Sequence, residues 1–230
     1  MTLSRRAIAY AKENRTAVFI ATGALIVLLV ALLAYRAARS SREAGAAEAY
    51  RQARTLLDDR KYTDAATAFR QTAETYPSTR HGVLAQLQNA NSLLLAERPG
   101  EAALRYQKFL DLSPPTDDLR QVALTRLGNA HEQDGKPAEA QAAYASAASI
   151  EGPFAPEALL GAARTTEQTG NSATARELYE DFLNRYPTSD RRSLVTARLV
   201  ALGGSVPAAE GDSDGSPRRP VVALPKPAAQ

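Results

Sequence analysis

Apolar residues follow two different patterns along this chain of 230 residues. Residues 17–35 (AVFIATGALIVLLVALLAY) carry no charge. As a helix this run is about 28 Å long at ~1.5 Å per residue, close to the ~30 Å hydrocarbon core of a bilayer. Beyond it the apolar positions recur with helical spacing, and no window alternates with the period of two that a strand needs. The pattern predicts an all-α protein with one membrane helix.

A triplet recurs in the second region: an alanine, an aromatic residue four positions later and a proline eight positions after that. The copies begin at steps of 37, 38 and 35 residues. They are Ala65, Phe69, Pro77; Ala102, Tyr106, Pro114; Ala140, Tyr144, with Gly152 and Pro153 near the proline position; and Ala175, Tyr179, Pro187. A spacing kept through four copies indicates one helical unit repeated in tandem and stacked into a solenoid.

Turn and cap residues divide this region into helix pairs. First helices are expected near 46–58, 80–96, 118–133 and 156–169, and second helices near 62–75, 99–111, 137–149 and 172–185. A capping helix over 189–202 would close the array, and residues 36–45 would continue the membrane helix as an arm. Ser78, Asp117 and Ser189 are the expected N-caps, and Gly135 and Gly170 the expected helix ends.

The C-terminal residues 203–230 are rich in Gly, Pro, Ser and charge, so this tail is predicted to be disordered. Pro217 and Pro220 have the spacing of a polyproline ligand. A solvated tail with incidental prolines is the favoured interpretation of these two residues.

The length of the apolar run and the charges that follow it favour an uncleaved anchor. A cleaved signal peptide remains the alternative. The run exceeds the usual ~7–15 residues of a signal peptide's apolar region, and Arg36, Arg39 and Arg42 follow it like a stop-transfer flank. Residues 1–16 are basic and are predicted to be cytoplasmic, which places the repeats outside the cytoplasm. Residues 1–42 have a net charge of +6 and residues 43–204 of −3. The repeats therefore lack the basic stripe of a nucleic-acid-binding protein.

The composition excludes several kinds of site. No cysteine is present, which rules out disulfides, thiolate metal sites and an acylated anchor. His81 and His131 are expected to be ordinary surface or packing residues, and no phosphate loop or nucleophile motif occurs. We therefore expect no enzyme activity, no cofactor and no metal. A catalytic role for His131 is the alternative from the enzyme class.

The repeats resemble the tetratricopeptide repeat, whose first helix carries a small residue that packs against the alanine and aromatic of the second. Ala53, Ala90, Gly128 and Ala163 occupy this place, each twelve residues before a key alanine. The resemblance covers residues 46–188, although the family's tryptophan is absent and the steps exceed its usual 34 residues. It implies a solenoid of about four helix pairs that binds proteins.

Two further resemblances concern function. The run from Ala11 to Asn14, the single apolar span, the arm rich in Arg, Ser and Ala, and Tyr50 at the start of the repeats resemble the membrane-anchored YfgM-like family of ancillary Sec translocon subunits. Residues 178–189 and 106–116 also resemble periplasmic repeat proteins that serve outer-membrane assembly and division-linked wall synthesis. Both resemblances imply a bacterial inner-membrane protein with periplasmic repeats.

The repeat geometry also predicts which residues line a concave groove. They lie at four positions of each first helix: Tyr50, Arg54 and Leu57; Leu84, Leu87, Asn91 and Leu94; Val122, Thr125, Asn129 and Glu132; Glu157, Leu160, Arg164 and Glu167. This surface is apolar in the second repeat and polar beyond it, which suits an extended or helical protein segment. Each residue also has the alternative of a solvated or packing role. The expected partners are secreted or envelope proteins, translocon components or periplasmic chaperones.

Overall fold

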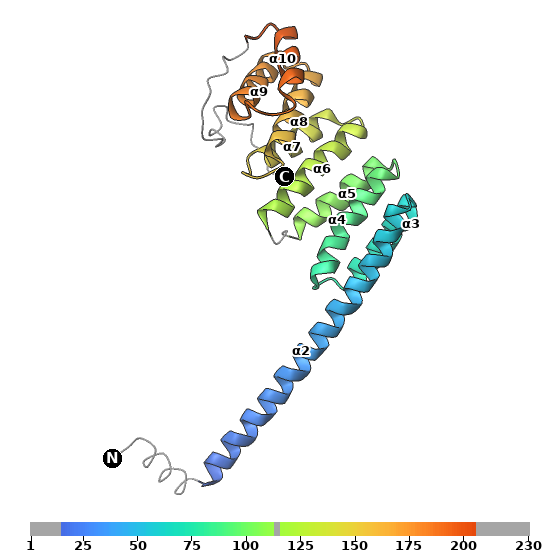
Figure 1. The fold of residues 1–230 in the computed structure, drawn as a ribbon, viewed down its shortest axis with the longest axis vertical. Helices are drawn as coiled ribbons and strands as arrows, with labels where there is room; N and C mark the ends of the chain where they lie inside the picture. The colour runs from blue at the N-terminus through green and yellow to red at the C-terminus, as the bar shows by residue number, and fades with distance from the viewer. Residues whose placement is uncertain (1–14, 113–115, 206–230) are drawn as a thin grey trace, which may run out of the picture.

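The computed structural model describes residues 15–112 and 116–205, and the helices in these ranges keep the labels of Figure 1. The described residues form nine helices and no strand. They are α2 (Arg15–Asp58), α3 (Tyr62–Thr75), α4 (Arg80–Leu95), α5 (Pro99–Asp111), α6 (Asp117–Gln133), α7 (Pro137–Ala148), α8 (Ala155–Gln168), α9 (Ser172–Arg185) and α10 (Arg192–Ala201). This confirms the all-α prediction. Residues 1–14, Pro114 and most of the predicted tail lie outside the described residues.

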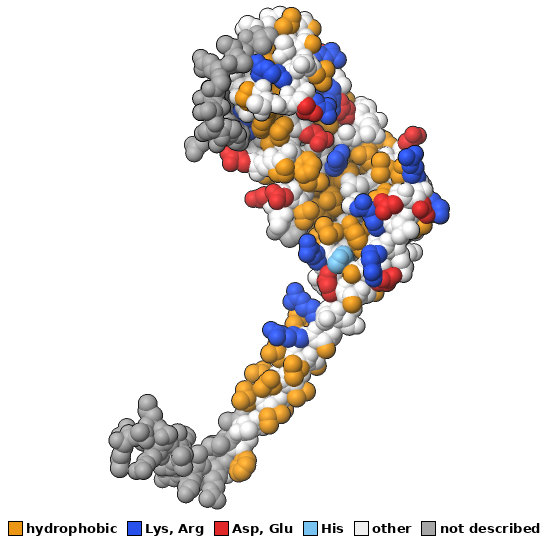
Figure 2. All heavy atoms as spheres, viewed as in Figure 1, with side chains coloured by type: hydrophobic (Ala, Val, Ile, Leu, Met, Phe, Trp, Pro, Cys, Tyr) orange, Lys and Arg blue, Asp and Glu red, His pale blue; other side chains and the backbone are white. Residues whose placement is uncertain are grey.

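Helix α2 is a single helix of 44 residues, about 66 Å long at ~1.5 Å per residue. Figure 1 shows it as a straight stem with the repeats stacked at its C-terminal end. Its apolar half is exposed, and Figure 2 shows the hydrophobic side chains along it, followed by basic ones where the repeats begin. Among the described residues, α2 is the one helix long and apolar enough to cross a membrane.

The remaining helices stack as antiparallel pairs. The C-terminal part of α2 pairs with α3, and the pairs α4–α5, α6–α7 and α8–α9 follow in order. Helix α10 packs on α9 through the buried Val195 and Leu199, which confirms the capping helix, although α10 begins three residues later than predicted. The four key alanines and the four key aromatics of the triplet are all buried. The triplet therefore marks the core of each pair.

Every first helix ends in the same way. The residue after its C-cap has a positive φ, and two backbone hydrogen bonds close a Schellman motif, as from Lys136 N–H to the His131 carbonyl (2.8 Å). Gly135 and Gly170 hold this place in α6 and α8, as predicted. Arg60 and Glu97 hold it in α2 and α4, with φ of 61° and 57°. Both are strained there, because a Cβ atom disfavours left-handed backbone.

The predicted N-caps are wrong. Thr79 rather than Ser78 caps α4, accepting a hydrogen bond from Gly82 N–H at 3.0 Å, and Thr116 rather than Asp117 caps α6. Ser189 accepts a hydrogen bond from Arg191 N–H ahead of α10 instead of capping it. In the first two cases the cap is the residue next to the one predicted, and its extended backbone aims the hydroxyl at the first turn.

A buried glutamine holds the imperfect turn of the third repeat. Gln121 in α6 donates from Nε2 to the carbonyls of Ala147 (3.3 Å) and Ile150 (2.5 Å) and accepts at Oε1 from Phe154 N–H (3.2 Å). A side chain at position 152 would collide with this amide, which explains the glycine there. The α7–α8 connection thus depends on a side chain from the preceding helix instead of the usual proline.

Candidate protein-binding groove

First helices lie beside first helices along the array. The contacts between α2 and α4, α4 and α6, and α6 and α8 build one continuous wall. Of the predicted groove residues on this wall, two are exposed and most of the others are partly buried, as expected for side chains that line a surface. The exposed ones are Arg54 and Glu157, and the partly buried ones are Tyr50, Leu57, Leu84, Asn91, Leu94, Val122, Asn129, Glu132, Arg164 and Glu167.

Three predicted groove residues are buried and do not line an accessible surface. Leu87, Thr125 and Leu160 are 6%, 0% and 8% exposed. They occupy the same position in the second, third and fourth repeats, fifteen residues before the key alanine. The side chain at this position is covered where neighbouring repeats meet. The hydroxyl of Thr125 is also satisfied inside its own helix, since it donates to the Gln121 carbonyl at 2.8 Å.

The key tyrosines reach from the second helices to the groove wall. The hydroxyl of Tyr106 donates to Oδ1 of Asn91 (2.5 Å), that of Tyr144 to Oε2 of Glu132 (3.1 Å) and that of Tyr179 to Oε2 of Glu167 (2.8 Å). Phe69, the aromatic of the first repeat, has no hydroxyl and instead packs edge-on against Tyr50 at 5.2 Å. The ring therefore fills the core of each repeat, and in the last three repeats its hydroxyl also orients a groove residue.

Glu132 is the centre of a polar cluster on the wall. Arg164 on α8 donates to both of its carboxylate oxygens, from Nε and Nη2, at 2.6 Å each, and Gln168 adds a contact at 3.4 Å. Burial raises the pKa of Glu132, but the hydrogen bonds from Arg164, Tyr144 and Gln168 outweigh burial and lower it below 4.5. A bidentate pair of this kind fixes both side chains and joins the third repeat to the fourth.

The family model of the tetratricopeptide repeat-like domain matches residues 9–204. The chain belongs to this family. Tetratricopeptide repeats form scaffolds for protein–protein interaction, so a protein partner is the expected ligand of the groove. A search of curated proteins finds no match to the chain.

The tetratricopeptide groove changes character along its length. In the second repeat its accessible side chains are largely apolar: Leu84 and Leu94 are partly buried hydrophobics, and Val122 follows on α6. In the last repeats its carboxylates are already paired, Glu132 with Arg164 and Glu167 with Arg198 on α10 at 3.5 Å. Figure 2 shows hydrophobic side chains gathered over the middle of the array, with charged ones around them. The apolar part is where a partner would gain most from burial.

The two histidines lie in different surroundings. Nδ1 of His81 is 2.8 Å from Oε1 of Glu43, which also accepts from Arg80 N–H through Oε2 at 3.2 Å. This contact ties the arm of α2 to the start of α4. His131 is half-buried on α6, and burial lowers its pKa. Within the described ranges, no cluster of three or more possible metal-binding side chains is found.

Proposed function

We propose that the protein is a membrane-anchored periplasmic adaptor whose tetratricopeptide groove binds secreted or envelope proteins, in an accessory, chaperone-like role at the Sec translocon. The continuity of α2 carries this proposal. One end of the helix exposes an apolar surface, with side chains such as Phe19 (76% exposed) and Val27 (69%) in solvent. The other end is a wall of the groove. Burying the apolar end in a bilayer removes this unfavourable exposure and holds the groove close to the membrane surface.

The groove supports an extended or helical protein segment as the ligand. Its apolar part offers hydrophobic side chains against which a partner can pack, and its paired carboxylates present little free charge to repel a partner of either sign. The translocon assignment is supported by the resemblance of the anchor, arm and first repeat to the YfgM-like family. A protein at the translocon would meet unfolded segments as they emerge.

Site-specific crosslinking in cells tests this proposal. A photoreactive residue at Leu84 or Asn129, both partly exposed on the wall, is expected to capture translocon subunits, periplasmic chaperones or emerging secreted proteins. The same residue at Gln107, exposed on the second helix α5, is the matched control and should capture none of these. Capture of cell-wall synthases or outer-membrane assembly factors alone would reject the translocon role and favour a scaffold for those machineries. This second candidate is motivated by the resemblance of residues 178–189.

The orientation needs its own test, because both candidates require the repeats to be periplasmic. A reporter that functions only outside the cytoplasm should be active when it is fused after Ala201. A reporter that functions only inside the cytoplasm should be inactive at the same position. The reverse result would overturn both candidates. Four basic residues precede the span and three follow it, and this small excess supports a cytoplasmic position for the segment before the span.

A further inference from the structure

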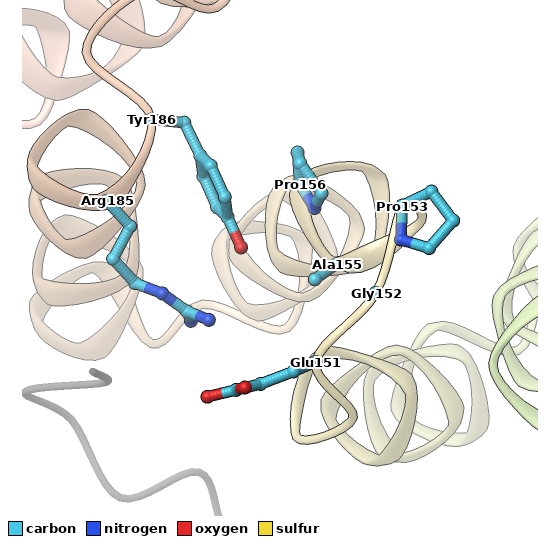
Figure 3. A pocket seen from close by; sticks show the side chains of 7 residues that line it. All are labelled: Glu151, Gly152, Pro153, Ala155, Pro156, Arg185 and Tyr186. Carbon is cyan, nitrogen blue, oxygen red and sulfur yellow. The ribbon is translucent and has the colours of Figure 1, made fainter. Parts of the chain in front are cut away.

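A small pocket lies at the turn between α7 and α8, and none of its lining residues belongs to the predicted groove. It has a volume of about 100 Å³. Its walls include Pro153 and Pro156 from the turn and the start of α8, and Arg185 and Tyr186 from the end of α9. Figure 3 shows the side chains of Arg185, Tyr186 and Glu151 pointing toward one another across it.

Arg185 provides a hydrogen-bond donor without a partner. Its side chain is buried, and the residue is only 6% exposed. Its Nη1 lies 3.5 Å from Oδ2 of Asp181, while its Nε has no hydrogen-bond partner among the described residues. Leaving such a buried N–H unpaired is unfavourable. A ligand that brings a carbonyl oxygen to this atom would remove that cost.

The charges around the pocket argue against an anion as the ligand. The guanidinium of Arg185 already faces Asp181, and Glu151 at the edge is exposed and forms no ion pair among the described residues. The three groups together carry a net negative charge. A ligand with a carbonyl and a neighbouring cation fits this arrangement.

The walls suit proline. Tyr186 and the two proline rings are rigid and apolar, and polyproline II ligands are recognised by such surfaces together with donors that reach their backbone carbonyls. Arg185 and the hydroxyl of Tyr186 supply the donors. Glu151 would select a ligand with a basic residue beside its prolines.

The chain's own C-terminal segment contains this ligand. Residues 217–220 read PRRP, two arginines between two prolines. Ser205 follows α10, and α10 packs on α9, whose end forms the pocket. The twelve residues that follow Ser205, up to Pro217, can span up to about 40 Å when extended, more than the combined length of α9 and α10, about 36 Å. The motif can therefore reach the pocket within one chain.

We propose that residues Pro217–Pro220 bind this pocket within the same chain, with the prolines against Tyr186 and Pro156 and the arginines facing Glu151. A tethered ligand has an effective concentration in the millimolar range, so a weak site is enough to hold it. The pocket would then seat the end of the chain at the turn between the third and fourth repeats.

Disulfide trapping in the full-length protein tests this docking. The chain has no cysteine, so Thr188→Cys with Ser216→Cys gives a single possible pair. We expect a disulfide within one chain, formed at least about fivefold more slowly when Pro217→Ala and Pro220→Ala are added, since these keep the charge but lose the ring contacts. An unchanged rate would overturn the proposal. So would a disulfide mainly between two chains, which would assign the pocket to the tail of a second copy.

A charge exchange tests the role of Glu151. Glu151→Arg should slow the trapping, and adding Arg218→Glu and Arg219→Glu should restore it. Glu177→Arg, also an exposed carboxylate but on α9 outside the pocket, is the matched control and should leave the rate unchanged. Equal slowing by both single reversals, or no restoration, would reject the pairing between Glu151 and the arginines. Circular dichroism of each variant verifies that the fold is retained.

Discussion

Two glycines let a single tyrosine join three helices. A Cβ atom added to Gly128 on α6 or to Gly161 on α8 would lie 2.7 Å from Cδ1 of Tyr144 on α7. The ring therefore lies against the backbone of both neighbouring first helices. It is only 2% exposed, and its hydroxyl is held by Glu132, so it has little freedom to move aside.

Gly161→Ala should accordingly destabilise the protein. Alanine favours the helix over glycine by up to about 1 kcal/mol, but overpacking a core costs about 1–3 kcal/mol, and the ring cannot retreat. We expect a net loss of about 1–2 kcal/mol in urea denaturation followed by circular dichroism. In the Tyr144→Leu background the same substitution should cost less. A gain in stability in the presence of Tyr144 would contradict the close contact.

Glu132 should make stability depend on pH in the acidic range. Its pKa in the folded protein lies below 4.5, so its carboxylate stabilises the fold at neutral pH, and this contribution is lost as the pH falls through the lowered pKa. Glu132→Gln should reduce the free energy of unfolding at pH 7, and the difference from the original protein should shrink below about pH 4.5. Glu177→Gln, an exposed control, should show a small difference throughout. A difference for Glu132→Gln that grows in acid would have the wrong sign.

At the scale of the helix, the Schellman turns offer a direct test of strain. Glu97 has a φ of 57° in a turn where α6 and α8 use glycine. Glu97→Gly should therefore stabilise the protein by about 1 kcal/mol, since the left-handed conformation costs a non-glycine residue about 1–2 kcal/mol. Ala96→Gly, one residue earlier with a φ of −80°, is the matched control and should not stabilise. Thermal unfolding of the two variants distinguishes them, and equal effects would contradict the assigned strain.

The helix pairs were predictable because each has its own local signals. The key alanines, aromatics and prolines mark the second helices, and glycines mark two of the four turns. Arg60 and Glu97 give no such signal, because arginine and glutamate are not residue types that favour a positive φ. Ser78 and Thr79 are equally able to cap, and the choice between them depends on backbone angles that the sequence does not display.

The groove was less predictable than the helices. Which side of a first helix is accessible depends on how the next repeat covers it, and this depends on the superhelix rather than on one helix. Leu87, Thr125 and Leu160 were misplaced for this reason. The links from Tyr144 to Glu132 and from Glu132 to Arg164 join residues 12 and 32 positions apart, so no local spacing reveals them.

At the scale of the whole molecule, the repeats are fixed to the stem by several contacts near the start of α4. Gly45 on α2 leaves room for Tyr76, whose hydroxyl would be 2.8 Å from an added Cβ atom. Glu43 reaches His81 and the backbone of Arg80, and Tyr50 packs edge-on against His81 at 5.6 Å. Hydrogen bonding to His81 chiefly lowers the pKa of Glu43. The stem and the array should therefore move as one body.

Gly45→Leu should loosen this junction. Leucine is a better helix former than glycine, so α2 itself would persist while Tyr76 is displaced. With spin labels at Arg39→Cys and Gln107→Cys, we expect a narrow distance distribution in the otherwise unchanged protein and a broader one with Gly45→Leu. Ala44→Leu, at an exposed position on the same helix, is the control and should leave the distribution narrow. A broad distribution before any substitution at Gly45 would show that the junction is not rigid.

Because α2 is one unbroken helix, the direction in which the groove faces around the helix axis depends on the number of residues in the stem. Once a bilayer holds the apolar end, one residue inserted between Arg36 and Arg42 would turn the groove by about 100° around the helix axis and raise it by about 1.5 Å. Seven inserted residues would return it to within about 20° of its original bearing, about 10 Å farther out. If α2 is anchored in a membrane, the length of the stem would thus select which neighbouring protein the groove faces.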